Sequence, residues 1–154
     1  MKSLVNSSSP VLIVAGSRRF PASAAPWLSG RLAAASSGFS ALWHGGCVSG
    51  VDLLAASWAS GVGLPVRSWP AAWSSLGRAA GPVRSRSMLA AAPAGSVLLA
   101  VASAAPSAQP GTVAAVRAAR SLGVPCRLAF LSPALSPLWS SLVPPALPPQ
   151  PLLF

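Results

Sequence analysis

Short apolar runs alternate with longer helix-like segments along most of this chain, and this alternation constrains the fold more than any other feature. The first and fourth runs, VLIVA and VLLAV, are wholly apolar, which is typical of strands buried on both faces of a sheet. We expect strands at 11–15, 41–43, 66–69, 97–101 and 127–131. We expect helices at 26–35, 51–60, 83–92 and 112–122. Strict alternation predicts an α/β fold, with about five strands in one doubly wound parallel sheet and about four helices on its faces.

The segments before and after this alternating region differ from it in composition, which predicts three parts to the chain. We expect residues 1–10 to form a flexible lead and residues 11–131 to form the folded domain. Residues 132–154 are dense in proline, which favours extended polyproline II structure, so we expect a Pro-rich C-terminal tail. Its apolar residues, Trp139 and 152–154, either pack back on the domain or bind a partner, unless the tail has no specific role.

Almost all charges of this chain are positive, because eleven Lys and Arg residues face a single acid, Asp52, for a net charge of +10. Such an excess favours anionic partners such as nucleotides, nucleic acid or acidic lipid. A GC-rich gene, which enriches Arg, Ala, Pro and Gly, is the alternative cause. At 53% hydrophobic residues the chain is too apolar for intrinsic disorder. No apolar stretch approaches the roughly 18 residues that a membrane-spanning helix needs.

The two cysteines, Cys47 and Cys126, are too few and too far apart in sequence for a disulfide framework or a zinc site. No base neighbours Cys47 in the sequence, which argues against a nucleophilic thiol. Residues 1–10 contain no apolar core of a secretion signal. We therefore expect a cytoplasmic protein with reduced thiols, no metal, no cofactor and no membrane partner.

Ligands of doubly wound sheets bind at the carboxyl ends of the strands, so the loops after the first, second and fourth strands are the candidate sites. After the first strand, Gly16 allows close approach of a phosphate, Ser17 adds a hydroxyl and Arg18 adds positive charge. The alternative is a plain turn with solvated arginines. After the fourth strand, Gly111 and Thr112 begin a helix in a phosphate-binding arrangement, unless Thr112 is only the helix cap.

The loop after the second strand carries three closely spaced glycines before a helix, Gly45, Gly46 and Gly50. We expect the N–H groups of this loop to form an anion nest, to which the helix dipole adds. Asp52 either benefits from the dipole of its helix, bonds a ribose hydroxyl or orders the glycine loop. His44 either contacts a ligand or bonds the backbone.

Two arginines, Arg84 and Arg86, fall in the first turns of the third expected helix, where positive charge opposes the helix dipole. A purely structural role explains such residues poorly. We therefore expect them to meet an anionic ligand or partner.

Four segments in this order resemble one known family: GSR at 16–18, HGGCVSGVD at 44–52, AGPVRSRSM at 80–88 and PGT at 110–112. The chain is similar to the small YspA/YpsA-related branch of the SLOG superfamily, which has a Rossmann-like fold. The resemblance implies a domain that binds nucleotides or nucleotide-derived molecules. With His44 and Arg86 added from the residue patterns, the candidate ligand-binding residues are Gly16, Ser17, Arg18, His44, Gly45, Gly46, Gly50, Asp52, Arg84, Arg86, Gly111 and Thr112.

The chain departs from its more distant relatives at positions that matter for catalysis. The cytokinin-activating phosphoribohydrolases, once called lysine decarboxylases, carry glutamates where this chain has Ala114 and Ala115. The family asparagine after the helix-start arginine is Ser85 here, and the acid often found after GSR is Arg19. Glycosidic cleavage needs a carboxylate, and Asp52 is the only one available.

Three functions therefore remain open. The first is a binding module or sensor for a phosphorylated nucleotide or a nucleotide-derived small molecule. The second is a single-stranded nucleic-acid binder, similar to the DNA-processing proteins of the superfamily and favoured by the positive charge and the six tryptophans. The third is a nucleotide phosphoribohydrolase, for which Asp52 and His44 are the only catalytic candidates, so enzymatic activity stays undecided. The low charge density also leaves homo-oligomerisation open.

Overall fold

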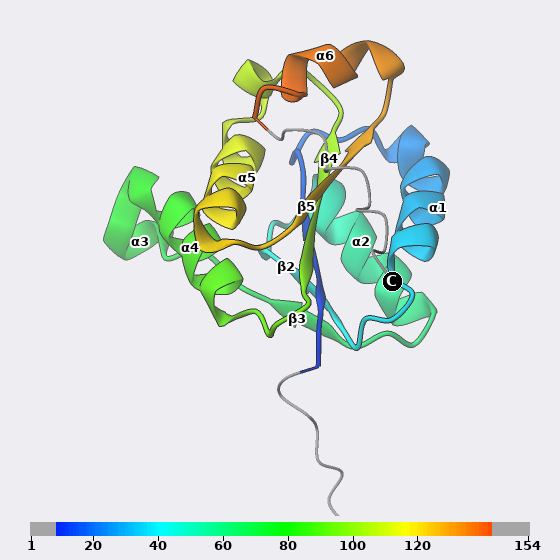
Figure 1. The fold of residues 1–154 in the computed structure, drawn as a ribbon, viewed down its shortest axis with the longest axis horizontal. Coiled ribbons are helices and arrows are strands. Elements are labelled where there is room, and N and C mark those ends of the chain that lie inside the picture. The colour runs from blue at the N-terminus through cyan, green and yellow to red at the C-terminus, as the bar shows by residue number, and fades with distance from the viewer. Residues whose placement is uncertain (1–8, 143–154) are drawn as a thin grey trace, which may run out of the picture.

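The computed structural model describes residues 9–142, and five parallel strands form its single sheet (Figure 1). The strands are β1 (Leu12–Ala15), β2 (Leu42–His44), β3 (Val66–Ser68), β4 (Val97–Ala102) and β5 (Cys126–Phe130). Their order across the sheet is β3-β2-β1-β4-β5. The expected Rossmann-like α/β fold with a doubly wound parallel sheet is thus confirmed.

Four helices of eleven to thirteen residues follow the expected pattern. They are α1 (Ala25–Ala35), α2 (Gly50–Gly61), α4 (Ala80–Ala91) and α5 (Pro110–Leu122). The sequence did not predict the two four-residue helices α3 (Trp73–Leu76) and α6 (Ser136–Trp139). Single 3-10 turns lie at Ala22–Ala24, Gly77–Ala79, Pro106–Ala108 and Pro133–Leu135.

The start of α4 lies earlier than the sequence predicted, at Ala80 instead of residue 83. Pro82 therefore lies inside the first turn and does not precede the helix. Proline is tolerated there because the first N–H groups of a helix have no carbonyl partner to lose. As a consequence, Arg84 lies at the start of the second turn.

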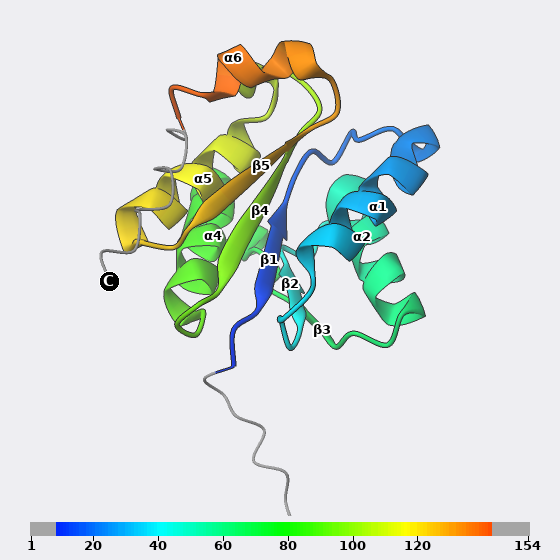
Figure 2. The ribbon, with the colours of Figure 1, turned by 45° about the vertical axis from the view of Figure 1, so that its right-hand side comes forward.

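Helices cover both faces of the sheet: α1 and α2 lie on one face, and α4 and α5 on the other (Figures 1 and 2). Successive side chains of β1 alternate between the two layers, so Leu12 and Val14 pack with α1 and α2 while Ile13 packs with α4 and α5. Every residue of β4 is buried. This two-sided burial explains why the strand sequences are almost wholly apolar.

The centre of the sheet is the point at which the strand order reverses. β1 pairs with β2 on one side and with β4 on the other. The chain leaves β1 toward the α1–α2 face and leaves β4 toward the α5 face. The loops after these two strands therefore separate, and a crevice between them is the usual place for a ligand in such folds.

Where the structure describes the expected tail, its extended conformation is wrong, and the alternative that Trp139 packs back on the domain is confirmed. Pro133 begins the last 3-10 turn, and Pro137 lies near the start of α6. Both positions suit the fixed φ of proline. Trp139 is completely buried, and its indole N–H donates to the carbonyl oxygen of Ala104 at 2.9 Å. Burial of this large side chain explains why a proline-rich segment folds onto the domain.

The outer parts of the predicted lead and tail, residues 1–8 and 143–154, lie outside the described residues. At the inner end of the lead, Pro10 is already part of the domain, because its carbonyl oxygen accepts hydrogen bonds from the backbone N–H and the hydroxyl of Ser40. None of the helices within residues 9–142 has the length and apolar character needed to cross a bilayer.

Candidate functional site

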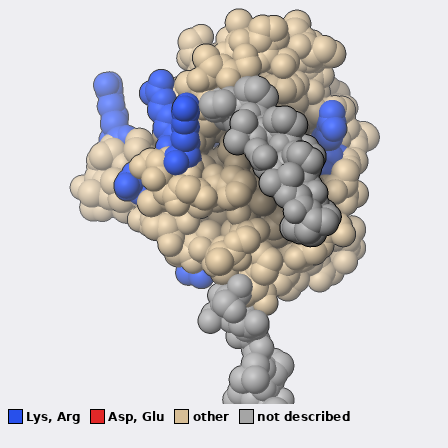
Figure 3. Space-filling model, in the orientation of Figure 1, with Lys and Arg blue, Asp and Glu red and all other residues tan. Residues whose placement is uncertain are grey.

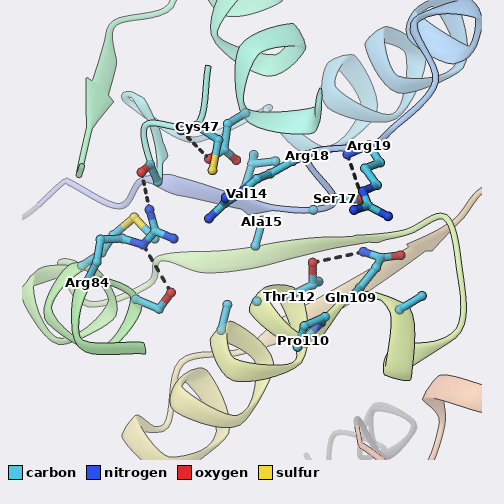
Figure 4. Close-up of a pocket in the computed structure, with 18 residues that line it drawn as sticks. Val14, Ala15, Ser17, Arg18, Arg19, Cys47, Arg84, Gln109, Pro110 and Thr112 are labelled. Carbon is cyan, nitrogen blue, oxygen red and sulfur yellow. Dashed lines mark hydrogen bonds between the residues drawn. The ribbon is translucent and has the colours of Figure 1, made fainter. Parts of the chain in front are cut away.

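A pocket of about 350 Å³ opens at the carboxyl ends of β1, β2 and β4 (Figure 4). Its walls are the loop after β1, the loop after β2 with the start of α2, the inner side of α4 and the start of α5. These are the loops to which the strand–helix alternation pointed. The volume lies within the range of about 300–1,000 Å³ that is usual for small-molecule sites.

The structure gathers most of the candidate ligand residues around this pocket. Those that line it are Gly16, Ser17, Arg18, Gly45, Asp52, Arg84, Gly111 and Thr112. Those that do not line it are His44, Gly46, Gly50 and Arg86. Other side chains in the lining, which the sequence did not single out as ligand residues, include Arg19, Cys47, Ser85, Met88, Gln109 and Ala115.

The loop after β1 is held tightly on the start of α2. The carbonyl oxygen of Ser17 accepts the N–H of Val51 at 3.1 Å, and the Ser17 hydroxyl oxygen accepts the N–H of Arg19 at 3.0 Å. A Cβ on Gly16 would lie 2.5 Å from a methyl carbon of Val51. Gly50, at φ +72°, packs against the backbone of Ser17 and leaves no room for a side chain. Both glycines thus serve close packing between the loop and the helix.

In the loop after β2, where an anion nest was expected, two N–H groups already have acceptors within the protein. The N–H of Gly46 donates to Nδ1 of His44 at 2.9 Å, and the N–H of Cys47 donates to the Asp52 carboxylate at 3.2 Å. Gly46 needs its glycine because its φ is +78°. Side chains of the protein therefore occupy two donors of this loop, and Asp52 orders it.

His44 is buried at the end of β2, and its imidazole faces the protein backbone. Because Nδ1 accepts a hydrogen bond, that nitrogen carries no proton. Burial lowers the pKa of His44 below its usual 6.5; the charge of Asp52 opposes this shift and that of Arg84 reinforces it. The sequence left open whether His44 contacts a ligand or bonds the backbone. In the structure it bonds the backbone of the loop and does not line the pocket.

Arg84 has a structural role that the sequence did not reveal. Its guanidinium donates to the carbonyl oxygen of Gly45 and to that of Trp69, the latter at 3.3 Å. The side chain thus ties α4 to the loops after β2 and β3, as Figure 4 shows for the contact with the β2 loop. Arg86, on the same helix, is exposed and does not line the pocket.

The start of α5 forms the opposite wall of the pocket (Figure 4). No side chain within residues 9–142 caps this helix. The N–H groups of Gly111 and Thr112 precede the first helical hydrogen bond, which runs from Val113 to Gln109. Gly111 is exposed and has open space on its Cβ side. The backbone donors of this turn and the positive end of the helix dipole therefore remain available at the pocket.

Gln109 shapes this wall and was missed by the sequence analysis. Its buried amide oxygen accepts the N–H groups of Ser103 and Ala104 at 2.8 and 2.9 Å. Its NH₂ group donates to the carbonyl oxygen of Val101 at 3.1 Å and to the Thr112 hydroxyl at 3.0 Å. The amide thereby joins the end of β4 to α5. A polar residue just before Pro-Gly at a helix start was the available signal.

The thiol of Cys47 faces the pocket beside Asp52. Burial raises the pKa of Cys47, and the negative charge of Asp52 and its hydrogen bond with the thiol raise it further, against the opposing charges of Arg18 and Arg84. The thiol is therefore protonated at neutral pH. Since a nucleophile needs the thiolate, this environment disfavours covalent chemistry at Cys47.

The tryptophans mostly serve the core and not the surface. The buried or partly buried ones are Trp27, Trp43, Trp58, Trp69 and Trp139. Trp73, at the start of α3, is 48% exposed, and the guanidinium of Arg18 lies 5.1 Å from its ring centroid. A row of exposed aromatic rings, as single-strand binders use, is thus not present within residues 9–142.

The pocket is electropositive. Arg18, Arg19 and Arg84 line it, and Asp52 is the one acid of the whole chain. Because Asp52 is buried, the face in Figure 3 displays basic side chains over the α3–α5 side and no acidic one among the described residues. The described residues bring no three His, Cys, Asp or Glu side chains together as metal ligands. A lining with three arginines and one carboxylate suits an anionic group.

Comparisons of the chain with protein-family models, with curated proteins and with solved structures yield no match.

Proposed function

We propose that this protein binds a phosphorylated nucleotide or a nucleotide-derived small molecule in the pocket at the carboxyl ends of β1, β2 and β4. The observation that carries the proposal is the uncapped start of α5, with Gly111 and Thr112 facing an electropositive pocket of suitable volume. Backbone N–H groups at a helix start, aligned with the helix dipole, are a recurrent binding arrangement for phosphate.

The loop after β1 supplies the side chains for the same phosphate. The Ser17 hydroxyl can donate a hydrogen bond while its oxygen accepts the N–H of Arg19. Arg18 and Arg19 add charge-assisted donors with the planar geometry that suits phosphate. A phosphate between this loop and α5 would offset the positive charge that the lining concentrates.

The nucleoside end of the ligand would extend toward Asp52 and Arg84. One oxygen of the Asp52 carboxylate accepts the N–H of Cys47, and the carboxylate retains lone pairs for a ribose hydroxyl. Asp52 thus can both order the loop after β2 and contact a sugar. A phosphate near α5 and a nucleoside near Asp52 together agree with the nucleotide ligands that the resemblance to SLOG proteins implies.

The lining favours binding over hydrolysis. Ala115 faces the pocket with a methyl group at one of the two positions where the resembled phosphoribohydrolases carry a glutamate. His44, the second catalytic candidate, is engaged with the Gly46 N–H outside the lining. With Asp52 as the only carboxylate of the chain, acid–base chemistry that needs a pair of carboxylates has no second partner.

Thermal-shift and calorimetric titrations at fixed moderate salt test this proposal. The panel contains AMP, ADP, ADP-ribose, NAD, cyclic nucleotides and a short single-stranded DNA. A ligand at about 100 times its dissociation constant stabilises by about 2.7 kcal/mol, which raises the Tm of a domain of this size by several degrees. We expect such a shift with at least one small nucleotide.

The decisive variant is Gly111→Asp, with Gly30→Asp as its matched control. Both glycines lie in helices and have open space around a Cβ, so the two substitutions add the same charge at tolerant positions. A carboxylate at position 111 suits the helix dipole and keeps the fold, yet it repels a phosphate. Loss of the shift in Gly111→Asp alone supports the proposal, whereas equal shifts in both variants or none in the natural protein overturn it.

Single-stranded nucleic acid is the second candidate, because exposed arginines accumulate on the outer side of α4 and α5. They are Arg86, Arg117 and Arg120. Contacts between these arginines and the phosphates of a nucleic acid would release counterions, so the affinity for nucleic acid would fall steeply as the salt concentration rises. A shift with DNA alone that disappears between about 50 and 200 mM salt would favour this function over the small-molecule site.

A further inference from the structure

Trp73 stands apart from the other described tryptophans, because its ring is 48% exposed and lies beside Arg18, a residue of the pocket lining. The ring belongs to α3, just before α4. A carbon at the tip of the indole lies 3.4 Å from the position that a Cβ on Gly81 would occupy, so the ring packs against the start of α4. Exposure of an indole costs free energy, and neither α3 nor α4 uses this ring in the core.

Arg18 connects this ring to the pocket. Its guanidinium lies 5.1 Å from the centroid of the Trp73 ring, and the same side chain lines the pocket. A cation over an exposed aromatic ring is a weak contact. A charge-assisted pair with phosphate is stronger, because both partners carry a full charge. A phosphate at the start of α5 would therefore draw Arg18 from the ring toward the pocket.

We infer that Trp73 is the stacking platform for the nucleobase of the bound nucleotide, with Arg18 exchanging the ring for the phosphate as the ligand enters. The inference rests on the proposed function and adds a base-recognition element to it. A flat aromatic occupant suits this ring, because it can stack on the face over which the planar guanidinium of Arg18 now lies. Stacking on one aromatic face selects a nucleobase over a sugar phosphate and tolerates different bases.

The neighbouring exposed side chains of Leu76 and Val83 suggest a different occupant, an apolar protein surface. The positive charge around Trp73 favours the base of an anionic nucleotide instead. Arg18 lies over the ring and Arg78 follows in the next turn, so the surroundings suit an anionic ligand. Arg18 also connects the ring to the pocket lining, and an apolar protein surface would offer that cation no charged partner.

Calorimetric titrations with two ligands, AMP and ribose 5-phosphate, separate the inference from the proposed function. Both carry the phosphate and the ribose, and only AMP carries a base. The variants are Trp73→Leu and Trp73→Phe, and Leu76→Ala on the same short helix is the control. Circular dichroism and the Tm verify that each variant is folded.

We expect AMP to bind the natural protein about tenfold or more tightly than ribose 5-phosphate. Trp73→Leu should remove this advantage, and Trp73→Phe should retain most of it. Ribose 5-phosphate should bind Trp73→Leu as tightly as the natural protein, or more tightly, because Arg18 no longer has to leave the ring. Leu76→Ala should change neither affinity. AMP should also quench indole fluorescence in the natural protein and not in Trp73→Phe.

Equal affinities of AMP and ribose 5-phosphate for the natural protein would overturn the stacking inference and leave the phosphate site intact. A loss of both affinities in Trp73→Leu, with the fold preserved, would likewise overturn it, since Trp73 would then act on the phosphate. If Leu76→Ala weakens AMP as much as Trp73→Leu does, the surface is an apolar docking face and the inference fails. Failure of both ligands to bind the natural protein would overturn the inference, and the absence of a thermal shift with every nucleotide of the panel would overturn the proposed function as well.

Discussion

The guanidinium of Arg84, on α4, donates a hydrogen bond to the carbonyl oxygen of Gly45 in the loop after β2. The two residues are 39 positions apart in sequence, so this bond joins separate segments of the fold. A second bond from the same guanidinium reaches Trp69 after β3. Arg84 therefore acts as a clamp on the pocket wall, which accounts for a cation near a helix start without any ligand.

Removal of this clamp should destabilise the fold. Arg84→Met keeps the apolar stem and loses both carbonyl bonds, and hydrogen bonds from charged donors contribute about 1.5–3 kcal/mol each when buried. Because Arg84 is only half-buried, we expect a loss of about 1–2 kcal/mol in urea unfolding. Arg86→Met, on the exposed side of the same helix, should change stability by less than about 0.5 kcal/mol. Equal stabilities of the two variants would contradict the clamp.

Close packing between Gly16 and Val51 gives a second prediction. Gly16→Ala places a methyl group 2.5 Å from a Val51 methyl carbon, and such overpacking costs about 1–3 kcal/mol. The double variant with Val51→Ala should be less destabilised than the sum of the single variants, because the smaller side chain makes room. Gly30→Ala, in open space on α1, should instead stabilise by about 0.5–1 kcal/mol. Chemical denaturation measures all four, and strict additivity would show that the two residues do not press on each other.

The pH dependence of stability should report on His44. Its pKa is lowered in the folded state, mainly by burial, so the unfolded chain binds the proton more readily. Stability is therefore highest above pH 6.5, falls as the pH drops below that value and levels off below the folded pKa.

Assignment of this slope is simple, since the chain holds one histidine and one acid. The charges that act on the pKa of His44 are those of Asp52 and Arg84. His44→Gln, whose amide oxygen can accept the Gly46 N–H, should flatten the curve between pH 5 and 7. An unchanged slope in His44→Gln would assign the effect to another group.

Thiol chemistry should distinguish the two cysteines. Burial raises the pKa of both, to about 12 for Cys126, so alkylation by iodoacetamide at pH 8 should be much slower than for free cysteine. Asp52 contributes to the shift at Cys47 only. Asp52→Asn should therefore accelerate alkylation of Cys47 several-fold and leave Cys126 unchanged, as peptide mass spectrometry can measure. A bound nucleotide should protect Cys47, which lines the pocket, and a uniform response of both thiols would contradict this placement.

The segment after β5 should be part of the cooperative fold. Trp139→Ala removes a completely buried indole and its bond to Ala104, and truncations of this kind cost about 3–5 kcal/mol. Leu138→Ala, at an adjacent and half-exposed position, should cost less than about 0.5 kcal/mol. Similar unfolding midpoints for the two variants would restore the interpretation of this segment as a tail.

Local sequence was enough to place the strands, the long helices and the loops that meet at the pocket. Apolar runs, prolines at helix starts and glycines at strand ends act over a few residues, so their pattern can be read without the fold. Strand–helix alternation then leaves a doubly wound parallel sheet as the expected arrangement, and the loops after β1, β2 and β4 necessarily lie at one edge.

Tertiary contacts decided which polar groups in those loops are free. The glycine loop was a candidate anion site, yet His44 and Asp52 take the N–H groups of Gly46 and Cys47, whereas no side chain of the described residues takes those at the start of α5. Residue type and spacing cannot reveal this, because whether a donor is satisfied depends on side chains that folding brings to it. The sequence left open whether Trp139 packs back on the domain, and for the same reason it could not name the partner, because Ala104 lies 35 positions away and meets Trp139 only in the folded chain.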